Sequence, residues 1–290
     1  MATLREIRRR ISSITNIQQI TNAMRMVAAA RFRRAQEAIL AARPYAYKFD
    51  TLLRHLASQM EMQKHPLLET REVKSVCIIV VASDRGLCGS FNHNVIRKTI
   101  SHIEDSYSDA EINLICVGRK GRDYFVLRHY NIIAEHINIF RHLDYHHAVG
   151  IAAHVTTLYT EKIVDRVDVI YNNFRSAILQ EVLVEQFLPI TPQKPEGDAL
   201  FTEYLYEPTS EEIWETVVPK YLDTQIWRIL LDSSAAEQAA RMTAMENATN
   251  NAEELINNLT LERNRARQTM ITREISEIVG GAEALAGARG

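Results

Sequence analysis

The sequence has few cysteines, few glycines and no long hydrophobic run. Three cysteines in 290 residues are too few, and odd in number, for a disulfide-stabilised secreted domain, which favours a reducing compartment. No apolar stretch approaches the ~20 residues that span a bilayer. The N-terminus MATLREIRRR also lacks the apolar segment of a secretory signal. We therefore expect a soluble intracellular protein.

Charge of either sign is not in excess. The chain carries 34 Lys and Arg residues against 36 Asp and Glu residues, a formal net charge of -2. Because nucleic-acid binding needs a surplus of cations, nucleic acid is not expected as a partner. With 46% hydrophobic and 24% charged residues, the chain is not disordered, and its length allows about two domains.

The ten glycines leave two long stretches without glycine, since none precedes Gly86 and none lies between Gly197 and Gly280. Residues 1–57 place apolar side chains three and four residues apart, as at Leu4, Ile7, Ile11 and Ile14. Residues 208–290 keep the same rhythm, after a Thr-x-x-Glu capping box at 209–212. Both segments predict long coiled-coil helices, in which the prolines at 44 and 219 are only kink candidates.

The two long helices should pair antiparallel, because both are attached to the same middle segment. Facing residue numbers should then add up to about 267, which brings Ala28 near Ala239. The C-terminal helix is the longer one and should extend about 20 Å beyond its partner as a single helix.

The middle of the chain has a different pattern. Short β-branched runs at 75–82, 112–117, 167–171 and 182–188 alternate with helical stretches at 93–107, from the glycines at 118 and 121 to Arg128, and at 146–161. This alternation predicts a central Rossmann-like α/β domain over residues 70–207, with a mostly parallel sheet. The complete fold class is therefore α/β with a long antiparallel coiled coil of the N- and C-terminal helices.

Few residues suggest chemistry. The loop SDRGLCGS at 83–90 follows a strand, where phosphates often bind, but it lacks a P-loop lysine and a third glycine. We interpret it as a tight structural turn, and the basic segment at 118–122 as a solvated helix start, with anion binding the weaker alternative for both. Cys88 is a candidate reactive thiol, whereas Cys77 and Cys116 lie on core strands.

Histidines at 142, 146 and 147 could place two imidazoles on one helix face, but no acidic or cysteine partner has ligand spacing nearby. No Ser/His/Asp or paired-carboxylate arrangement can be argued from spacing either. The sequence therefore predicts no catalytic residue, no metal site and no cofactor.

Four ordered blocks resemble the ATP synthase gamma subunit family. They are LREIR with ITNAMRMVAAA at 4–8 and 20–30, SDRGLCG at 83–89, AARM with ATNNA at 239–242 and 248–252, and ITREISEIVGGA at 271–282. The resemblance covers nearly the whole chain and implies a non-catalytic rotor, a coiled-coil axle inside a ring of alternating alpha and beta subunits. Proton-driven rotation of the c-ring would then be coupled to conformational change at the beta subunits during ATP synthesis.

The resemblance also implies partners and contact residues. The partners are the alpha and beta subunits, the epsilon subunit and the c-ring, with membrane contact only through the complex. The torque and bearing contacts fall on Met24, Arg25, Arg241, Gln268, Thr272 and Glu274.

The sequence also departs from the family pattern. Gln19 and Asn22 stand where many members carry lysine, so cationic contacts to the ring should be fewer. The redox cysteines of chloroplast members have no counterpart between residues 121 and 221. This favours a bacterial source and a peripheral position on the cytoplasmic face of the inner membrane. The alternative is a nucleotide-using α/β enzyme that oligomerises through its coiled coil, which a missing phosphate signature disfavours.

Overall fold

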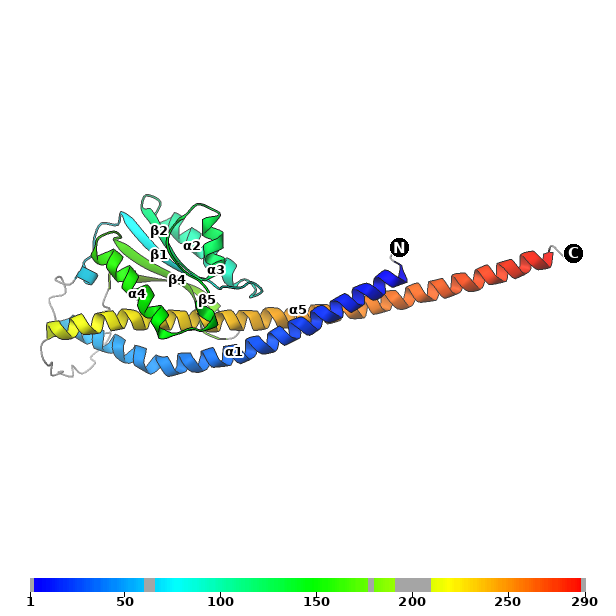
Figure 1. Ribbon diagram of the computed structural model, residues 1–290, viewed down its shortest axis with the longest axis horizontal. Coiled ribbons are helices and arrows are strands. Elements are labelled where there is room, and N and C mark those ends of the chain that lie inside the picture. The colour runs from blue at the N-terminus through cyan, green and yellow to red at the C-terminus, as the bar shows by residue number, and fades with distance from the viewer. Residues whose placement is uncertain (1–2, 60–65, 177–179, 191–209, 288–290) are drawn as a thin grey trace. The chain divides into compact units, whose positions relative to one another are not determined.

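The structure is a computed structural model that describes residues 3–59, 66–176, 180–190 and 210–287 (Figure 1). Two long helices, α1 (Leu4–Gln59) and α5 (Ser210–Gly287), flank an α/β segment. Both continue through their prolines, Pro44 and Pro219. The predicted capping residue at 209 lies outside the described residues. The elements between the two helices are η2 (Pro66–Leu68), β1 (Ser75–Val81), α2 (Phe91–Ser106), β2 (Glu111–Val117), α3 (Arg119–Val126), β3 (Asn131–His136), η3 (Ile139–Arg141), α4 (Tyr145–Thr160), β4 (Arg166–Phe174) and β5 (Gln180–Leu188).

The strands form one sheet in the order β3-β2-β1-β4-β5. The first four are parallel, and β5 pairs antiparallel with β4. The predicted mostly parallel sheet is therefore confirmed. The sequence did not predict β3, whose residues NIIAEH are polar at both ends and only partly buried. Such an edge strand lacks the continuous apolar run that marks a central parallel strand.

Alternate residues of β1 pack into two different hydrophobic layers. Val76, Ile78 and Val80 join a cluster with side chains of α2 and α3, whereas Cys77, Ile79 and Val81 join one with side chains of α4 and α5. This alternation follows from the period of two along a strand. Because both faces are covered, every residue from Val76 to Val81 is buried, at about 1.5–3 kcal/mol for each large apolar side chain.

The chain divides into two compact units, residues 28–241 and residues 1–27 with 242–290. Within the first, α1 packs on α5 through a cluster in which small residues predominate. It contains Phe32, Ala35, Ile39, Leu231, Ala235, Ala236 and Ala239. Ala235, Ala236 and Ala239 are fully buried, so the helix backbones approach closely there. Ala28 is buried as well.

In the second unit the two helix ends pair antiparallel. The hydroxyl oxygens of Thr21 and Thr249 lie 2.8 Å apart, so facing residue numbers total 270, about one turn from the predicted 267. Helix α1 ends at Gln59, two residues beyond the predicted boundary, which shifts the sum in the observed direction.

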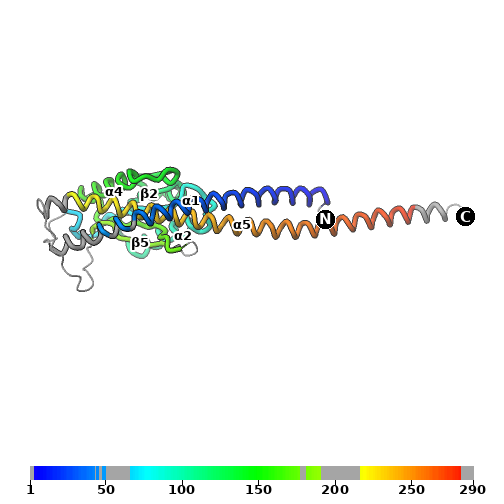
Figure 2. Tube along the Cα trace, turned by 90° about the horizontal axis from the view of Figure 1, so that it is seen from below, coloured from blue at the N-terminus to red at the C-terminus, as the bar shows by residue number. Residues whose placement is uncertain are grey.

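Beyond this pairing α5 continues as a single helix. Every residue from 267 to 281 is exposed, and Figures 1 and 2 show α5 extending past the N-terminus of α1. The helix runs through Gly280 and Gly281 as far as Gly287. The unpaired stretch is therefore about 30 Å long at 1.5 Å per residue, longer than the sequence predicted.

Candidate functional site

The loop after β1 lies where parallel α/β sheets commonly bind ligands. In an open parallel sheet, ligands bind outside the carboxyl ends of the strands where the strand order reverses, which here lies between β1 and β4. Ser83 opens the loop fully buried. Its backbone N–H donates to Asn92 Oδ1 at 2.9 Å, and its hydroxyl donates to the Arg85 carbonyl at 2.6 Å.

The chain's own carboxylate fills the position that an anion would take. Asp84 Oδ1 accepts hydrogen bonds from the backbone N–H groups of Arg119, at 3.1 Å, and of Asn138, at 2.7 Å. Arg119 is the first residue of α3, so Asp84 supplies the negative charge that a helix N-terminus favours. These contacts favour the structural interpretation of the loop over phosphate binding.

Gly118 allows the strands and the loop to come this close. Its φ is +93°, and an added Cβ would lie 2.1 Å from the Ala82 carbonyl oxygen. Any other residue would therefore push β1 and the start of α3 apart.

Arg241 fixes α5 to the same loop. Its guanidinium donates to the carbonyl oxygens of Gly86, at 3.1 Å, and Arg85, at 3.3 Å, and also pairs with Glu237. Both charged residues are more than nine-tenths buried. Burial raises the pKa of Glu237, and the neighbouring Arg241 charge opposes that rise. Removing either residue would leave the charge of the other buried without a partner, which is strongly destabilising.

The cysteines are all buried. Cys88 is 1% exposed, and its sulfur accepts a hydrogen bond from Asn92 Nδ2 at 3.2 Å. Burial raises the pKa of the Cys88 thiol, so the thiol stays protonated at neutral pH. The suggestion that Cys88 is reactive is therefore wrong. Burial also raises the pKa of Cys77 and of Cys116 to about 12, as expected for core residues.

The histidine group has a structural role at the start of α4. Asp144 accepts a hydrogen bond from the His146 backbone N–H at 3.0 Å, and His147 Nδ1 accepts one from the Asp144 backbone N–H at 3.1 Å. This is a capping box with histidine at its third position. Over 3–59, 66–176, 180–190 and 210–287, no three His, Cys, Asp or Glu residues are placed to hold a metal ion.

A buried polar network on α2 and β4 escaped the sequence analysis. Asp168 is fully buried and accepts hydrogen bonds from Tyr107 OH at 2.6 Å and Arg166 Nε at 3.0 Å; His102 Nε2 lies 2.8 Å away. Burial raises the pKa of Asp168, but His102, Tyr107 and Arg166 together lower it below its ordinary value. His102 and Asp168 are 66 residues apart, so no spacing rule joins them.

The remaining predicted contact residues lie in the second unit. Met24 and Arg25 are half-buried, and Arg25 donates to Asn22 Oδ1 at 3.0 Å. Gln268, Thr272 and Glu274 are exposed on the single stretch of α5. The Thr272 hydroxyl donates to the Gln268 backbone carbonyl at 2.9 Å.

Comparison with known proteins identifies the family of this chain. The ATP synthase family model matches residues 3–285. An ATP synthase gamma chain of Chloroherpeton thalassium is 49% identical, over 98% of this chain and 99% of its own length. This chain belongs to the ATP synthase gamma chain family. Gamma chains of Chlorobium phaeobacteroides (strain DSM 266) and Pelotomaculum thermopropionicum are 47% and 46% identical, over 99% and 98% of this chain and 100% of their own lengths.

Solved structures of the family share the fold. The central stalk and c-ring structure of the Tetrahymena thermophila mitochondrial ATP synthase contains a chain that matches with a TM-score of 0.64 and 28% identity, over 79% of this gamma chain and 99% of that chain. A chain of the Euglena gracilis mitochondrial ATP synthase matches with a TM-score of 0.70 and 19% identity, over 99% of this chain and 96% of that one. No helix in the described part of this gamma chain is both long and apolar enough to cross a membrane.

Proposed function

We propose that this gamma chain is the central-stalk rotor of an F-type ATP synthase. It would couple proton-driven rotation of the c-ring to conformational change at the catalytic beta subunits during ATP synthesis, and would itself be non-catalytic. The proposal is supported by near full-length relatives that are named ATP synthase gamma chains and by a 28% identical chain from a central stalk and c-ring structure.

The observation that carries this proposal is the single stretch of α5. It exposes large apolar side chains, among them Ile271, Ile275 and Ile278 at 45%, 56% and 71%. A long solitary helix with exposed apolar residues is unfavourable in water, unless a partner encloses it. A ring of alpha and beta subunits around this helix would provide that enclosure.

The other partners follow from the same assignment. We infer contacts with the epsilon subunit and the c-ring, and a peripheral position on the cytoplasmic face of a bacterial inner membrane. The bacterial origin of the near full-length relatives supports that location.

We further propose Met24, Arg25, Arg241, Gln268, Thr272 and Glu274 as torque and bearing contacts. A rotor must leave each position in turn, so its contacts should be individually weak. Gln268, Thr272 and Glu274 are exposed and suit this requirement, since exposed ion pairs contribute only about 0–1 kcal/mol. Arg241 differs from the other five because it is buried, with its guanidinium bound to carbonyl oxygens of the loop at 83–90. Its contribution would be to hold the loop at 83–90 against α5.

The competing proposal, a nucleotide-using enzyme, is less well supported. Two backbone N–H groups that could bind an anion, that of Arg119 at the start of α3 and that of Asn138 after β3, are engaged by Asp84. A titration of the purified chain with ATP and magnesium separates the two functions. Saturable binding with turnover that survives repurification would favour the enzyme.

The rotor proposal is tested by two disulfides in the assembled complex. The first is internal, between cysteines at Thr21 and Thr249, whose hydroxyl oxygens are 2.8 Å apart, with Cys77, Cys88 and Cys116 replaced. Because α1 and α5 would turn as one body, this crosslink should leave ATPase activity nearly intact. The second joins the same stretch to a beta subunit and should stop multi-site turnover until it is reduced.

Each crosslink is the control for the other, since both introduce one disulfide at the same stretch of the helical pair and differ only in what that stretch is joined to. Equal inhibition by both would mean that α1 and α5 move against each other, which contradicts a rigid axle. Full activity with the external crosslink would contradict rotation itself.

A further inference from the structure

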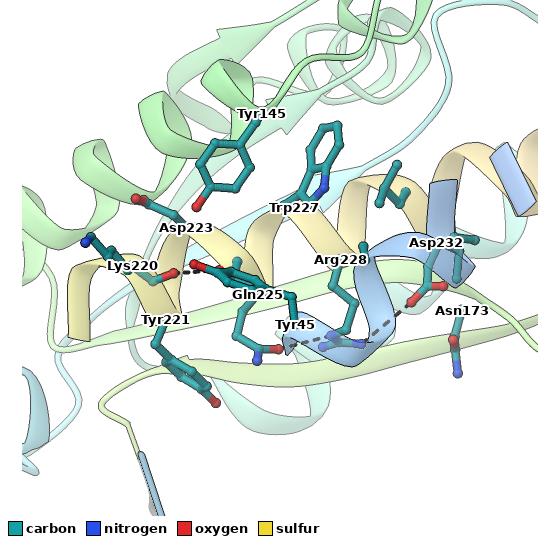
Figure 3. Close-up of a pocket in the computed structure, with 14 residues that line it drawn as sticks. Tyr45, Tyr145, Asn173, Lys220, Tyr221, Asp223, Gln225, Trp227, Arg228 and Asp232 are labelled. Atoms are coloured by element: carbon teal, nitrogen blue, oxygen red, sulfur yellow. Dashed lines mark hydrogen bonds and ion pairs between the residues drawn. The ribbon is translucent and has the colours of Figure 1, made fainter. Parts of the chain in front are cut away.

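A cavity of about 980 Å³ opens where α1, α4, β4 and α5 meet, within residues 28–241 (Figure 3). Its lining residues include none from the loop at 83–90 and none from the single stretch of α5. Four aromatic side chains line it, Tyr45 from α1, Tyr145 from α4, and Tyr221 and Trp227 from α5. The volume is in the range of small-molecule sites, which are typically largely apolar with a few polar groups.

The aromatic rings form an open cage. Tyr145 and Trp227 meet edge to face, with ring centroids 5.9 Å apart and planes at 77°. Tyr45 is braced by Phe49, with centroids 4.6 Å apart. Tyr45 and Tyr145 remain 54% and 38% exposed, so ring surface is open to a ligand. A cation is attracted to the negative face of an aromatic ring, and the exposed ring surface of Tyr45 and Tyr145 is open to such a contact.

A carboxylate stands beside this cage without a counter-charge. Asp223 is half-buried, and no hydrogen bond or ion pair joins it to any residue that the structure describes. Figure 3 shows the Tyr145 side chain extending from α4 into the space between Asp223 and Trp227 of α5. Burial alone raises the pKa of Asp223, as expected for a carboxylate that no neighbouring cation stabilises.

The other charges at the cavity are already balanced or solvated. Arg228 pairs with Glu185 at 2.6 Å and with Asp232 at 3.7 Å, and donates to Gln225 at 3.0 Å. Lys220 is exposed, and its nitrogen is not within 4.0 Å of a carboxylate of any described residue. Asp223 is therefore the charge that a ligand would neutralise.

We propose that this cavity binds an amphipathic organic cation, one that joins an aromatic ring to a quaternary or tertiary ammonium group. Tyr45, Tyr145 and Trp227 surround the cationic head, Asp223 supplies the counter-charge, and the apolar side chains of Ile39 and Leu231 receive the hydrocarbon part. The site goes beyond the proposed rotor function and does not depend on it, because the ligand contacts only this chain.

The test compares a cation with a neutral molecule of the same shape. Benzyltrimethylammonium and its carbon isostere neopentylbenzene are titrated against the full-length chain by ligand-observed NMR. The cation should bind at least about ten-fold more tightly, within the range of cation–π and counter-charge effects. Asp223→Asn should reduce that preference to less than about three-fold and leave the affinity for neopentylbenzene unchanged.

Two measurements guard against a variant that fails to fold. Lys220→Gln removes a charge of opposite sign from the same rim, so it should leave the cation affinity equal or higher. In the unaltered chain, cation affinity should fall as acidification protonates Asp223, whereas neopentylbenzene affinity should not. Equal affinity for the two probes, or a preference that survives both Asp223→Asn and acidification, would overturn the proposal.

Discussion

Two buried side chains of opposite charge, Arg241 and Glu237, join α5 to the loop that follows β1. The guanidinium satisfies two loop carbonyls as well as Glu237, so both its charge and its fork of donors are used. The cluster lies at the carboxyl end of β1, where other proteins with this sheet arrangement bind ligands. Here the polar groups of the crevice are engaged by the chain itself.

Replacing Arg241 with methionine should destabilise residues 28–241 by about 3–5 kcal/mol, because Glu237 is left buried without a partner. The loss should depend on pH. Without Arg241, the pKa of Glu237 rises further above its ordinary value, so the destabilisation should be larger at pH 8 than at pH 5. Urea unfolding followed by circular dichroism measures both effects.

The double variant Arg241→Met with Glu237→Met is the matched control. Removing both charges should recover part of the lost stability and abolish the extra pH dependence. A double variant as unstable as Arg241→Met alone would show that the loop carbonyls, and not Glu237, account for the loss.

Asp168 supports a second prediction at the scale of a residue. Its pKa in the folded protein is lowered, so its contribution to stability is present above the unfolded pKa of about 3.8 and is lost as pH falls through the folded value. Asp168→Asn should therefore cost about 3–5 kcal/mol at pH 6, and the difference from the unaltered chain should shrink below pH 3.8.

Asp109, an exposed residue after α2, provides the comparison. Asp109→Asn should change the unfolding free energy by less than about 0.5 kcal/mol at every pH. If Asp168→Asn behaves in the same way, the hydrogen-bond network around Asp168 does not stabilise the fold.

At the scale of an element, α5 has two different faces of contact. Its residues Leu222, Ile226 and Ile229 join the hydrophobic layer beneath the sheet, whereas the small residues that follow pack against α1. The small side chains let two helices approach closely while the sheet stays covered. The spacing of small residues and the partner helix could be predicted from the sequence, but the sum of facing residue numbers, 270 at Thr21 and Thr249, differs from the predicted 267.

The close packing of α1 on α5 predicts a size limit at Ala239, which is fully buried. Ala239→Leu should destabilise the unit of residues 28–241 by about 1–3 kcal/mol through overpacking. Ala30→Leu, the same substitution at an exposed position of α1, should change stability by less than about 0.5 kcal/mol. Thermal unfolding of the two variants under one condition distinguishes them, and equal melting temperatures would contradict close helix packing.

At the scale of the whole molecule, the two units differ in how much of their apolar surface is buried within the chain. Residues 28–241 contain three hydrophobic clusters around a sheet with both faces covered. The other unit pairs two helices and then exposes every residue from 267 to 281. One unit therefore has hydrophobic cores of its own, and the other leaves a helix with exposed apolar side chains for a partner.

Deleting residues 268–290 should separate folding from assembly. The α/β fold should keep its unfolding midpoint, because residues 268–281 contribute no buried side chain. Assembly with alpha and beta subunits should weaken, and the chain alone should become more soluble because the exposed isoleucines are removed. Co-purification yield and light scattering measure these effects. A lower melting temperature of the α/β fold would mean that the tail packs on its own chain.

Much of this protein can be predicted from local patterns. The long stretches without glycine, with apolar residues three and four apart, specify two long helices. The apolar run at 75–82 specifies a buried strand, because periodicity decides which surfaces must be covered. The four motif blocks also identify the family from the sequence alone, because each block is continuous in sequence.

Only the tertiary structure decided the contacts between distant residues. The pairing of His102 with Asp168, the approach of Arg241 to Gly86, and the cavity between Tyr45, Tyr145 and Asp223 each join segments that no spacing rule connects. The fate of Cys88 was decided in the same way, because its pKa depends on the side chains that bury it. Sequence periodicity determines which faces of each helix and strand must be buried, whereas distances between chemical groups depend on how those faces meet.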